Sequence, residues 1–121
     1  MGLFEYASNY SETKELHSNP NLQTRYYRNN YKIAKEVLIN YAKNNKINIR
    51  NINDTHGEIY LQTQKYHVIS TIVQITPLET AVELKVQTYY VIGRYRALKI
   101  IKKIYNEFDN KLVFKGVSLH P

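Results

Sequence analysis

The sequence predicts an α+β fold in the order strand, helix, four strands, helix. We expect a five-stranded antiparallel sheet with both helices packed on one face. Two segments carry apolar residues at helical spacing, and the segments between them alternate apolar and polar residues as strands do. Short turns join these strands, so neighbouring strands should run antiparallel. The chain has 121 residues, the size of one domain, and 43% of them are hydrophobic, enough for a packed core.

The N-terminal segment, residues 1–21, is polar and carries three acidic residues against one basic residue. Its apolar residues show little periodicity, so we expect an arm that is partly ordered at best. Residues 22–121 then form the single domain. Within it, residues 22–29 are rich in Thr and Tyr and predict the first strand.

The first helix is predicted from Tyr31 to Asn44, with Asn30 as its N-cap. Asn44 and Asn45 should end it, because Asn tolerates the left-handed conformation common after a helix. The apolar stripe that we expect to face the core consists of Ile33, Ala34, Val37, Leu38, Tyr41 and Ala42.

Four strands are predicted between the helices, and the last has the clearest alternation. They cover residues 47–50, 59–64, 66–75 and 81–90. Turns should separate them at 54–57, where Gly57 can take a positive φ, at 64–65, and at 76–79, which contains a proline.

A second helix is predicted over residues 94–111, after Gly93 interrupts the last strand. Its apolar stripe begins at Ala97 and ends at Leu112. The tail that follows, residues 113–121, is apolar for a terminus, and we expect it to dock on the domain.

Positive charge is concentrated on the helices, and the net charge of the chain is +7. Residues 94–121 carry seven basic side chains against two acidic ones. Such a basic stripe could contact phosphates or anionic lipid headgroups. The alternative is an ordinary solvated helix face in a chain enriched in Lys. The tightest cluster is Arg94, Arg96, Lys99, Lys102 and Lys103.

Twelve tyrosines give the chain an unusual aromatic content. Period-two counting places Tyr60 and Tyr89 on the sheet face away from the helices, and we expect Tyr27 or Tyr26 on the first strand to join them. An open face with Tyr side chains could stack bases or form a dimer interface. The alternative is that Tyr simply favours strands.

Several classes of function are not supported by the sequence. There is no Cys, which excludes disulfides and thiolate chemistry. The four His lack metal-ligand spacing, and His56 beside Asp54 and Glu58 is better explained as part of a turn. No phosphate loop or nucleophile elbow is present, so we expect neither a cofactor nor an enzyme. With no membrane-spanning stretch and no signal peptide, we expect a cytoplasmic protein.

Four stretches suggest a family resemblance that covers nearly the whole chain after the arm. They are TRYYR at 24–28, NDTHGE at 53–58, VQITPLETAV at 73–82 and FKGVSLHP at 114–121. Through them the chain resembles an uncharacterised family of small cytosolic proteins from low-GC Gram-positive bacteria, a domain of unknown function. The element order resembles that of the TATA-box-binding-protein half and the helix-grip folds. The resemblance implies no activity, ligand or catalytic residue.

Three hypotheses of function follow. The first is a small non-enzymatic domain that acts through its surface, by self-association or by binding a partner. The second is a nucleic-acid or anionic-surface binder that uses the basic second helix. The third is a carrier that holds a small apolar ligand between sheet and helices.

Overall fold

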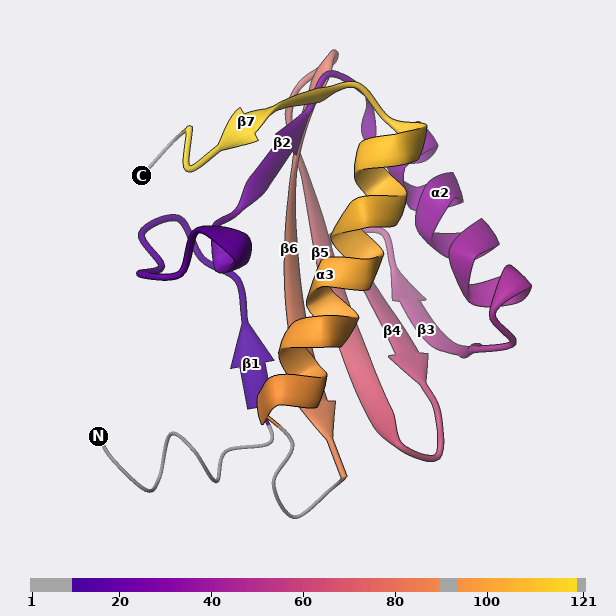
Figure 1. The fold of residues 1–121 in the computed structure, drawn as a ribbon. Coiled ribbons are helices and arrows are strands. Elements are labelled where there is room, and N and C mark those ends of the chain that lie inside the picture. Colours follow the sequence, from indigo (N-terminus) through magenta and orange to yellow (C-terminus); the bar gives the residue numbers. More distant parts are fainter. Residues whose placement is uncertain (1–9, 90–93, 120–121) are drawn as a thin grey trace.

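The described residues form two α-helices, one 3₁₀ helix and seven strands (Figure 1). The computed structural model describes residues 10–89 and 94–119, without the side chains of Asn21, Arg94 and Tyr95. The elements are β1 (Tyr10–Glu12), the 3₁₀ helix η1 (Pro20–Leu22), β2 (Arg25–Tyr27), α2 (Tyr31–Asn44), β3 (Asn48–Asn53), β4 (Glu58–Gln62), β5 (Tyr66–Thr76), β6 (Glu79–Thr88), α3 (Arg94–Lys111) and β7 (Phe114–Val117).

The strands form one sheet in the order β3-β4-β5-β6-β2-β7, and β1 pairs with β6 beyond the end of β2. All strand pairs are antiparallel. The α+β class is confirmed, but the prediction of five strands is wrong, because β1 and β7 were not expected as strands. β1 falls inside the segment predicted as an arm, and β7 falls in the tail. Strands of three and four residues are too short for an alternation signal, and distant partners stabilise them.

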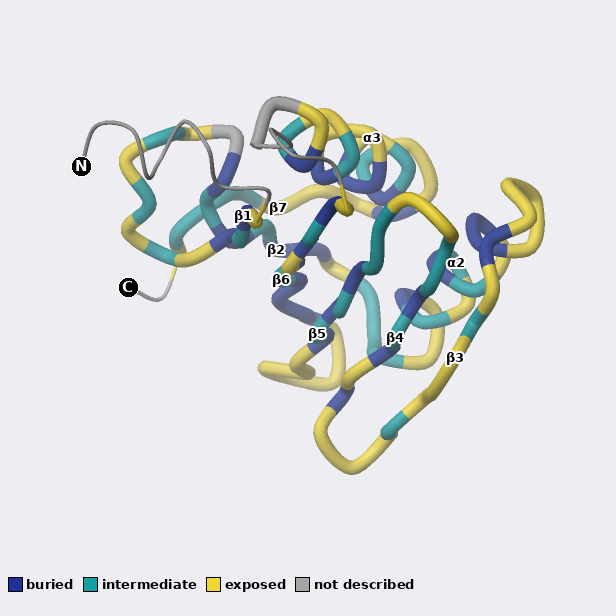
Figure 2. Tube along the Cα trace, turned by 90° about the horizontal axis from the view of Figure 1, so that it is seen from below, coloured by how far each residue is buried: buried dark blue, intermediate teal, exposed yellow. Residues whose placement is uncertain are grey.

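Both helices lie on the same face of the sheet (Figures 1 and 2). The alternation of β6 explains this: Val82, Leu84 and Val86 are fully buried toward the helices. α2 begins where predicted, since the Asn30 side-chain oxygen accepts a hydrogen bond from the Ile33 amide at 2.9 Å. Tyr90 and Gly93 lie outside the described residues.

The core lies between this sheet face and the helices. The largest completely buried side chains include Leu38, Ile59, Leu61, Leu84, Ile101 and Phe108. The Tyr105 hydroxyl of α3 also donates a hydrogen bond to the Val82 carbonyl at 2.7 Å. Burial of apolar side chains from both helices leaves the opposite sheet face as the surface that the fold does not use for its own core.

Candidate functional site

The sheet face opposite the helices carries no helix of the described residues (Figure 2). Side chains that face this way alternate with the buried ones along β4, β5 and β6. The register brings Gln62 opposite His67 and His67 opposite Gln87. An aromatic and basic group of side chains therefore gathers at the end of this face near the β4–β5 turn.

Five side chains from four segments form what we call the open-face cluster: Arg50, Tyr60, Gln62, His67 and Tyr89. The Tyr60 and His67 rings stack, with centroids 5.4 Å apart and planes 24° from parallel. The Tyr89 ring follows, 5.8 Å from His67 and tilted by 48°. The Arg50 guanidinium carbon lies 5.5 Å from the Tyr60 ring centroid, within the range of a cation–π contact. The cluster is thus a row of flat groups on a sheet face that no described helix covers.

Hydrogen bonds orient the rings of the cluster. The Gln62 amide donates to the Tyr89 hydroxyl at 2.7 Å. The same hydroxyl is hydrogen-bonded to Nδ1 of His67 at 2.8 Å. Burial and the charge of Arg50 lower the pKa of His67 below its ordinary 6.5. At neutral pH the cluster therefore presents an uncharged imidazole between two phenol rings.

A β-bulge brings Arg50 to the cluster. The register between β3 and β4 shifts between Ile49, which pairs with Leu61, and Asn51, which pairs with Tyr60. Arg50 is the extra residue in this interval. Bulges reorient a side chain relative to its neighbours. Arg50 consequently reaches the Tyr60 ring and also donates to the Gln62 side-chain oxygen at 3.3 Å.

Tyr27 does not belong to the open face, and its prediction is corrected. It pairs with Thr80, so it points toward the helices and is completely buried. Its hydroxyl donates to Asp109 at 2.7 Å, and burial, with this bond, raises its pKa. Tyr26 has the opposite orientation but is covered, with its hydroxyl bonded to Glu15. At β2, the N-terminal segment therefore covers the sheet face opposite the helices. At β4 and β5 no described helix covers the same face.

The predicted basic cluster of the second helix lies along the solvent side of α3. Arg96, Lys99, Lys102 and Lys103 are all exposed. Arg94 begins the helix, and its side chain lies outside the described part. Arg96, Lys99, Lys102 and Lys103 belong to α3 on the helix side of the sheet, whereas the open-face cluster lies on the opposite side. The structure therefore places the two predicted sites, the tyrosines and the basic helix, on different faces.

Three of the five cluster residues were not singled out by the sequence. Gln62 follows Tyr60 at the period of a strand, so extending the alternation would have found it. His67 and Arg50 could not be found this way. The register of β5 and the bulge in β3 bring them to Tyr60, and both depend on long-range pairing.

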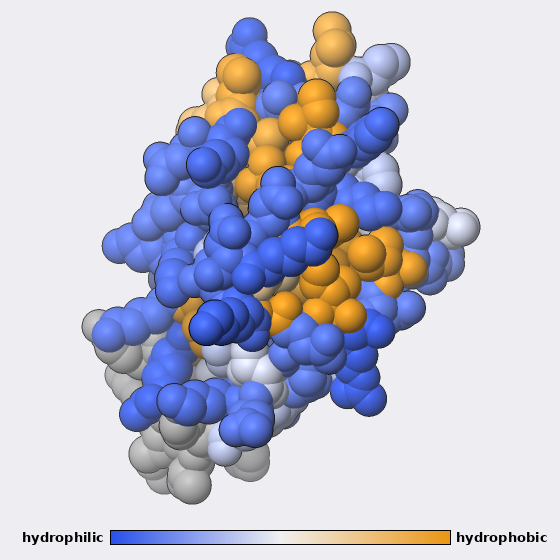
Figure 3. All heavy atoms as spheres, turned by 90° about the vertical axis from the view of Figure 1, so that its right-hand side faces the viewer, coloured by the Kyte–Doolittle hydropathy of each residue, from blue (hydrophilic) through white to orange (hydrophobic). Residues whose placement is uncertain are grey.

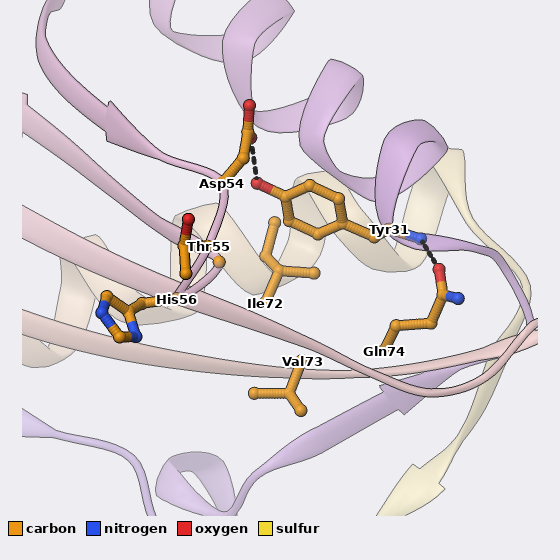
Figure 4. A pocket seen from close by; sticks show the side chains of 8 residues that line it. Tyr31, Asp54, Thr55, His56, Ile72, Val73 and Gln74 are labelled. Carbon is orange, nitrogen blue, oxygen red and sulfur yellow. Dashed lines mark hydrogen bonds between the residues drawn. The ribbon is translucent and has the colours of Figure 1, made fainter.

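A cavity of about 360 Å³ lies between the start of α2, the β3–β4 turn and β5 (Figure 4). Two of its polar side chains, Asp54 and Gln74, already bind Tyr31. Asp54 accepts hydrogen bonds from the Tyr31 hydroxyl at 2.6 Å and from Lys35 at 2.8 Å, and these lower its pKa. The His56 ring points away from this pair in Figure 4. Among the described residues, no group of three or more His, Cys, Asp or Glu side chains could hold a metal ion.

Two further cavities open elsewhere on the described surface. One of about 210 Å³ lies between α2 and α3, lined by residues such as Val37 and Glu107. The other, of about 370 Å³, lies at the β4–β5 turn. These three cavities are lined mainly by turn residues, strand ends and outer helix residues. The carrier hypothesis needs an apolar cavity between sheet and helices, and these cavities do not provide one.

The side of the molecule formed by α2 and β3 is mainly hydrophilic, with apolar atoms in separate patches (Figure 3). Ile33 on α2 and Ile52 on β3 are partly exposed, at 44% and 37%. Apolar atoms contribute a large share of the surface of ordinary folded proteins. This side offers no functional group comparable to the open-face cluster.

Comparisons of the chain with family models, with curated proteins and with solved structures gave no match. The resemblance to a family of small cytosolic proteins therefore stays a prediction. Within the described residues, neither helix has the length and apolar character needed to cross a membrane.

Proposed function

We propose that this protein binds single-stranded nucleic acid on the open face of its sheet. The observation that carries the proposal is the stack of Tyr60 and His67, flanked by Tyr89 and Arg50, on a face that no described helix covers. Unpaired bases stack on such rings, and each base–aromatic contact contributes about 1–3 kcal/mol.

The charge of the protein supports the same ligand. A net charge of +7 favours a polyanion through release of its counterions. Within the cluster, Arg50 adds a planar cation that can stack on a base or contact a phosphate. Tyr89, with 48% of its surface exposed, offers ring area at the edge of the cluster. Base stacking on the rings and attraction of phosphates by Arg50 would thus act together in the open-face cluster.

The shape of the face favours single strands over duplexes. A duplex keeps its bases stacked on each other and exposes only their edges in the grooves. The inner rings of the cluster already stack on each other, so a base can join the row only at its exposed end, at Tyr89, and only when that base is itself unstacked. An unpaired strand should therefore compete effectively for the site, and a duplex of the same sequence should bind through charge alone.

Removing the Tyr60 ring tests the proposal. Tyr60→Ala should weaken binding of a fluorescent oligothymidylate by about 5- to 100-fold, because about 1–3 kcal/mol of stacking is lost. Tyr60→Phe keeps the ring and should bind like the wild type. Fluorescence anisotropy at about 50 and about 200 mM salt measures both affinities.

A matched control uses Tyr31→Ala, which removes a partly buried ring on the helix side of the molecule. This variant should bind like the wild type. Absence of wild-type binding at the lower salt, or equal losses for Tyr31→Ala and Tyr60→Ala, would contradict the proposal. If sedimentation instead shows a dimer that Tyr60→Ala dissociates, the open face serves self-association.

Binding should strengthen as the pH falls. The pKa of His67 lies below 6.5, so the imidazole is neutral at pH 7 and gains a proton only as the pH falls through that lowered value. Protonation adds a positive charge beside Arg50, between Tyr60 and Tyr89, and a polyanion binds the charged form more tightly. Affinity for oligothymidylate, whose bases do not titrate in mildly acidic solution, should rise as the pH is lowered below about 6.5. The variant His67→Gln should lose most of this rise.

The stability of the free protein changes in the opposite direction. Because the pKa of His67 is lower in the folded than in the unfolded chain, the unfolded chain binds more protons below about pH 6.5. Stability contributed by His67 is therefore lost as the pH falls. Binding should be measured where the circular dichroism spectrum is unchanged. An affinity that His67→Gln leaves equally pH-dependent would show that His67 does not contact the ligand.

A further inference from the structure

We propose that the cavity at the β4–β5 turn binds backbone phosphates of a single-stranded nucleic acid, the same molecule whose bases stack on the open-face cluster. The inference rests on the proposed function and extends it with a phosphate site. The cavity has a volume of about 370 Å³. Its lining includes Lys46, Lys65, Lys103, Thr63 and Tyr66.

Three lysines from three separate segments converge on this cavity. Lys46 lies in the turn after α2, Lys65 in the β4–β5 turn, and Lys103 on α3. All three are exposed, and none forms an ion pair with a carboxylate of the described residues. Burial and the nearby Glu107 carboxylate raise the pKa of Tyr41, and Glu107 itself lines the neighbouring cavity between the helices. The cavity thus has three positive charges and no carboxylate among its lining residues.

The backbone at Lys46 is unusual for a lysine. Its φ of 56° lies in the left-handed region that favours glycine, and a side chain there costs about 1 kcal/mol. Two hydrogen bonds hold the turn, from the Lys46 amide to the Lys43 carbonyl and from the Ile47 amide to the Ala42 carbonyl. Glycine would form this turn with less strain. The presence of lysine at a strained position is therefore consistent with a role for its side chain in binding rather than in stability.

The cavity is connected directly to the open-face cluster through the β4–β5 turn. The Lys65 carbonyl accepts a hydrogen bond from the Tyr89 amide at 2.9 Å. The Thr63 carbonyl accepts from the Gln62 side chain at 2.7 Å. Tyr66 and His67 are neighbours on β5, so one faces the cavity side and the other the open face. A nucleic-acid strand that extends beyond the open-face cluster therefore crosses only residues 63–65 before it reaches the three lysines of the cavity.

The path continues along the predicted basic cluster of α3. Lys103, Lys99 and Arg96 are spaced by four and three residues, so they lie on one side of the helix. Lys103 is the member that also lines the cavity. This path connects the open-face cluster with the basic cluster of α3, although the two lie on different faces. Together they form one surface for a longer nucleic-acid strand. Bases would stack at one end and phosphates would contact lysines at the other.

Oligothymidylates of different lengths separate the two parts of this surface. A strand of about four nucleotides should fill the cluster, and a strand of about twelve should also reach the cavity. For the longer strand, Lys46→Ala, Lys65→Ala and Lys103→Ala should each reduce the slope of log affinity against log salt by about 0.7 to 1. For the shorter strand these variants should have little effect.

Two controls separate charge from folding. Lys32→Ala removes an exposed lysine at the other end of α2 and should leave both salt slopes unchanged. Lys46→Gly relieves the left-handed backbone while removing the charge, so it should fold at least as well as the wild type and still show the smaller slope. Thermal unfolding of each variant verifies the fold.

The outcomes distinguish the two proposals. If Tyr60→Ala weakens binding but the three lysine variants behave like Lys32→Ala, the phosphate site is wrong and the proposed function stands. If the lysine variants weaken binding and Tyr60→Ala does not, the stacking site and the continuous path are both wrong. Losses from both kinds of variant, with the lysine effect confined to the longer strand, support both proposals.

Discussion

Asp109→Ala is expected to lower the free energy of unfolding by about 3 kcal/mol, through loss of the polar contact that ties α3 to β2. The Asp109 carboxylate accepts hydrogen bonds from Arg25 at 2.8 and 3.2 Å and from the Tyr27 hydroxyl at 2.7 Å. Arg25 also packs over two rings, 4.6 Å from the Phe114 centroid and 5.3 Å from that of Tyr105. Without the carboxylate, a buried hydroxyl and a guanidinium lose their acceptor.

The expected loss is at the lower end of the range for broken buried ion pairs. The Arg25 and Asp109 side chains keep 20% and 26% of their exposure, so water partly replaces the missing partner. Urea unfolding measures the change. Asp109→Asn keeps one acceptor oxygen and should lose less, and Asn110→Ala at the next, exposed position should lose under about 0.5 kcal/mol. Equal stabilities of Asp109→Ala and Asn110→Ala would show that the cluster contributes little.

Gly57→Ala is expected to destabilise the protein by at least about 3 kcal/mol, from a strained backbone and a steric clash. Gly57 has a φ of 68°, which an L side chain rarely adopts. An added Cβ would lie 2.1 Å from the Ile72 carbonyl oxygen. The backbone would have to move away and break the 2.8 Å hydrogen bond from the Ile72 amide to the Gly57 carbonyl.

Gly116→Ala in β7 is the matched control for Gly57→Ala. There an added Cβ would meet the Leu119 side chain at 3.0 Å, which can rotate away, so the cost should stay below about 1 kcal/mol. Thermal and urea unfolding of the two variants give the comparison. A loss for Gly57→Ala no larger than that for Gly116→Ala would mean that the β3–β4 turn can change its conformation at low cost.

The helices could be predicted from the sequence because local rules specify them. The apolar spacing and the cap at Asn30 predicted α2 with the bounds that the structure shows, and α3 also has its predicted bounds. The long strand β6 followed from alternation in the same way, and β5 from its many β-branched residues. The side chains within these elements lie close in sequence, so the hydrophobic pattern carries the information.

The candidate site was only half predictable for the same reason. Tyr60 and Tyr89 were placed on the open face by alternation within their own strands. Tyr27 was misplaced, because the three residues of β2 give no usable pattern and its orientation follows from pairing with Thr80. His67 reaches Tyr60 only through the register of β5.

The amino-acid order alone specified the class of fold, both helices, the main strands and the excess of positive charge near the C-terminus. Packing in three dimensions specified the edges of the sheet, the bulge at Arg50, the stack of aromatic rings and the meeting of Lys46, Lys65 and Lys103 around one cavity. The reason is physical. Periodicity reports which side of an element is apolar, whereas register and the approach of distant segments depend on contacts between residues far apart in the chain.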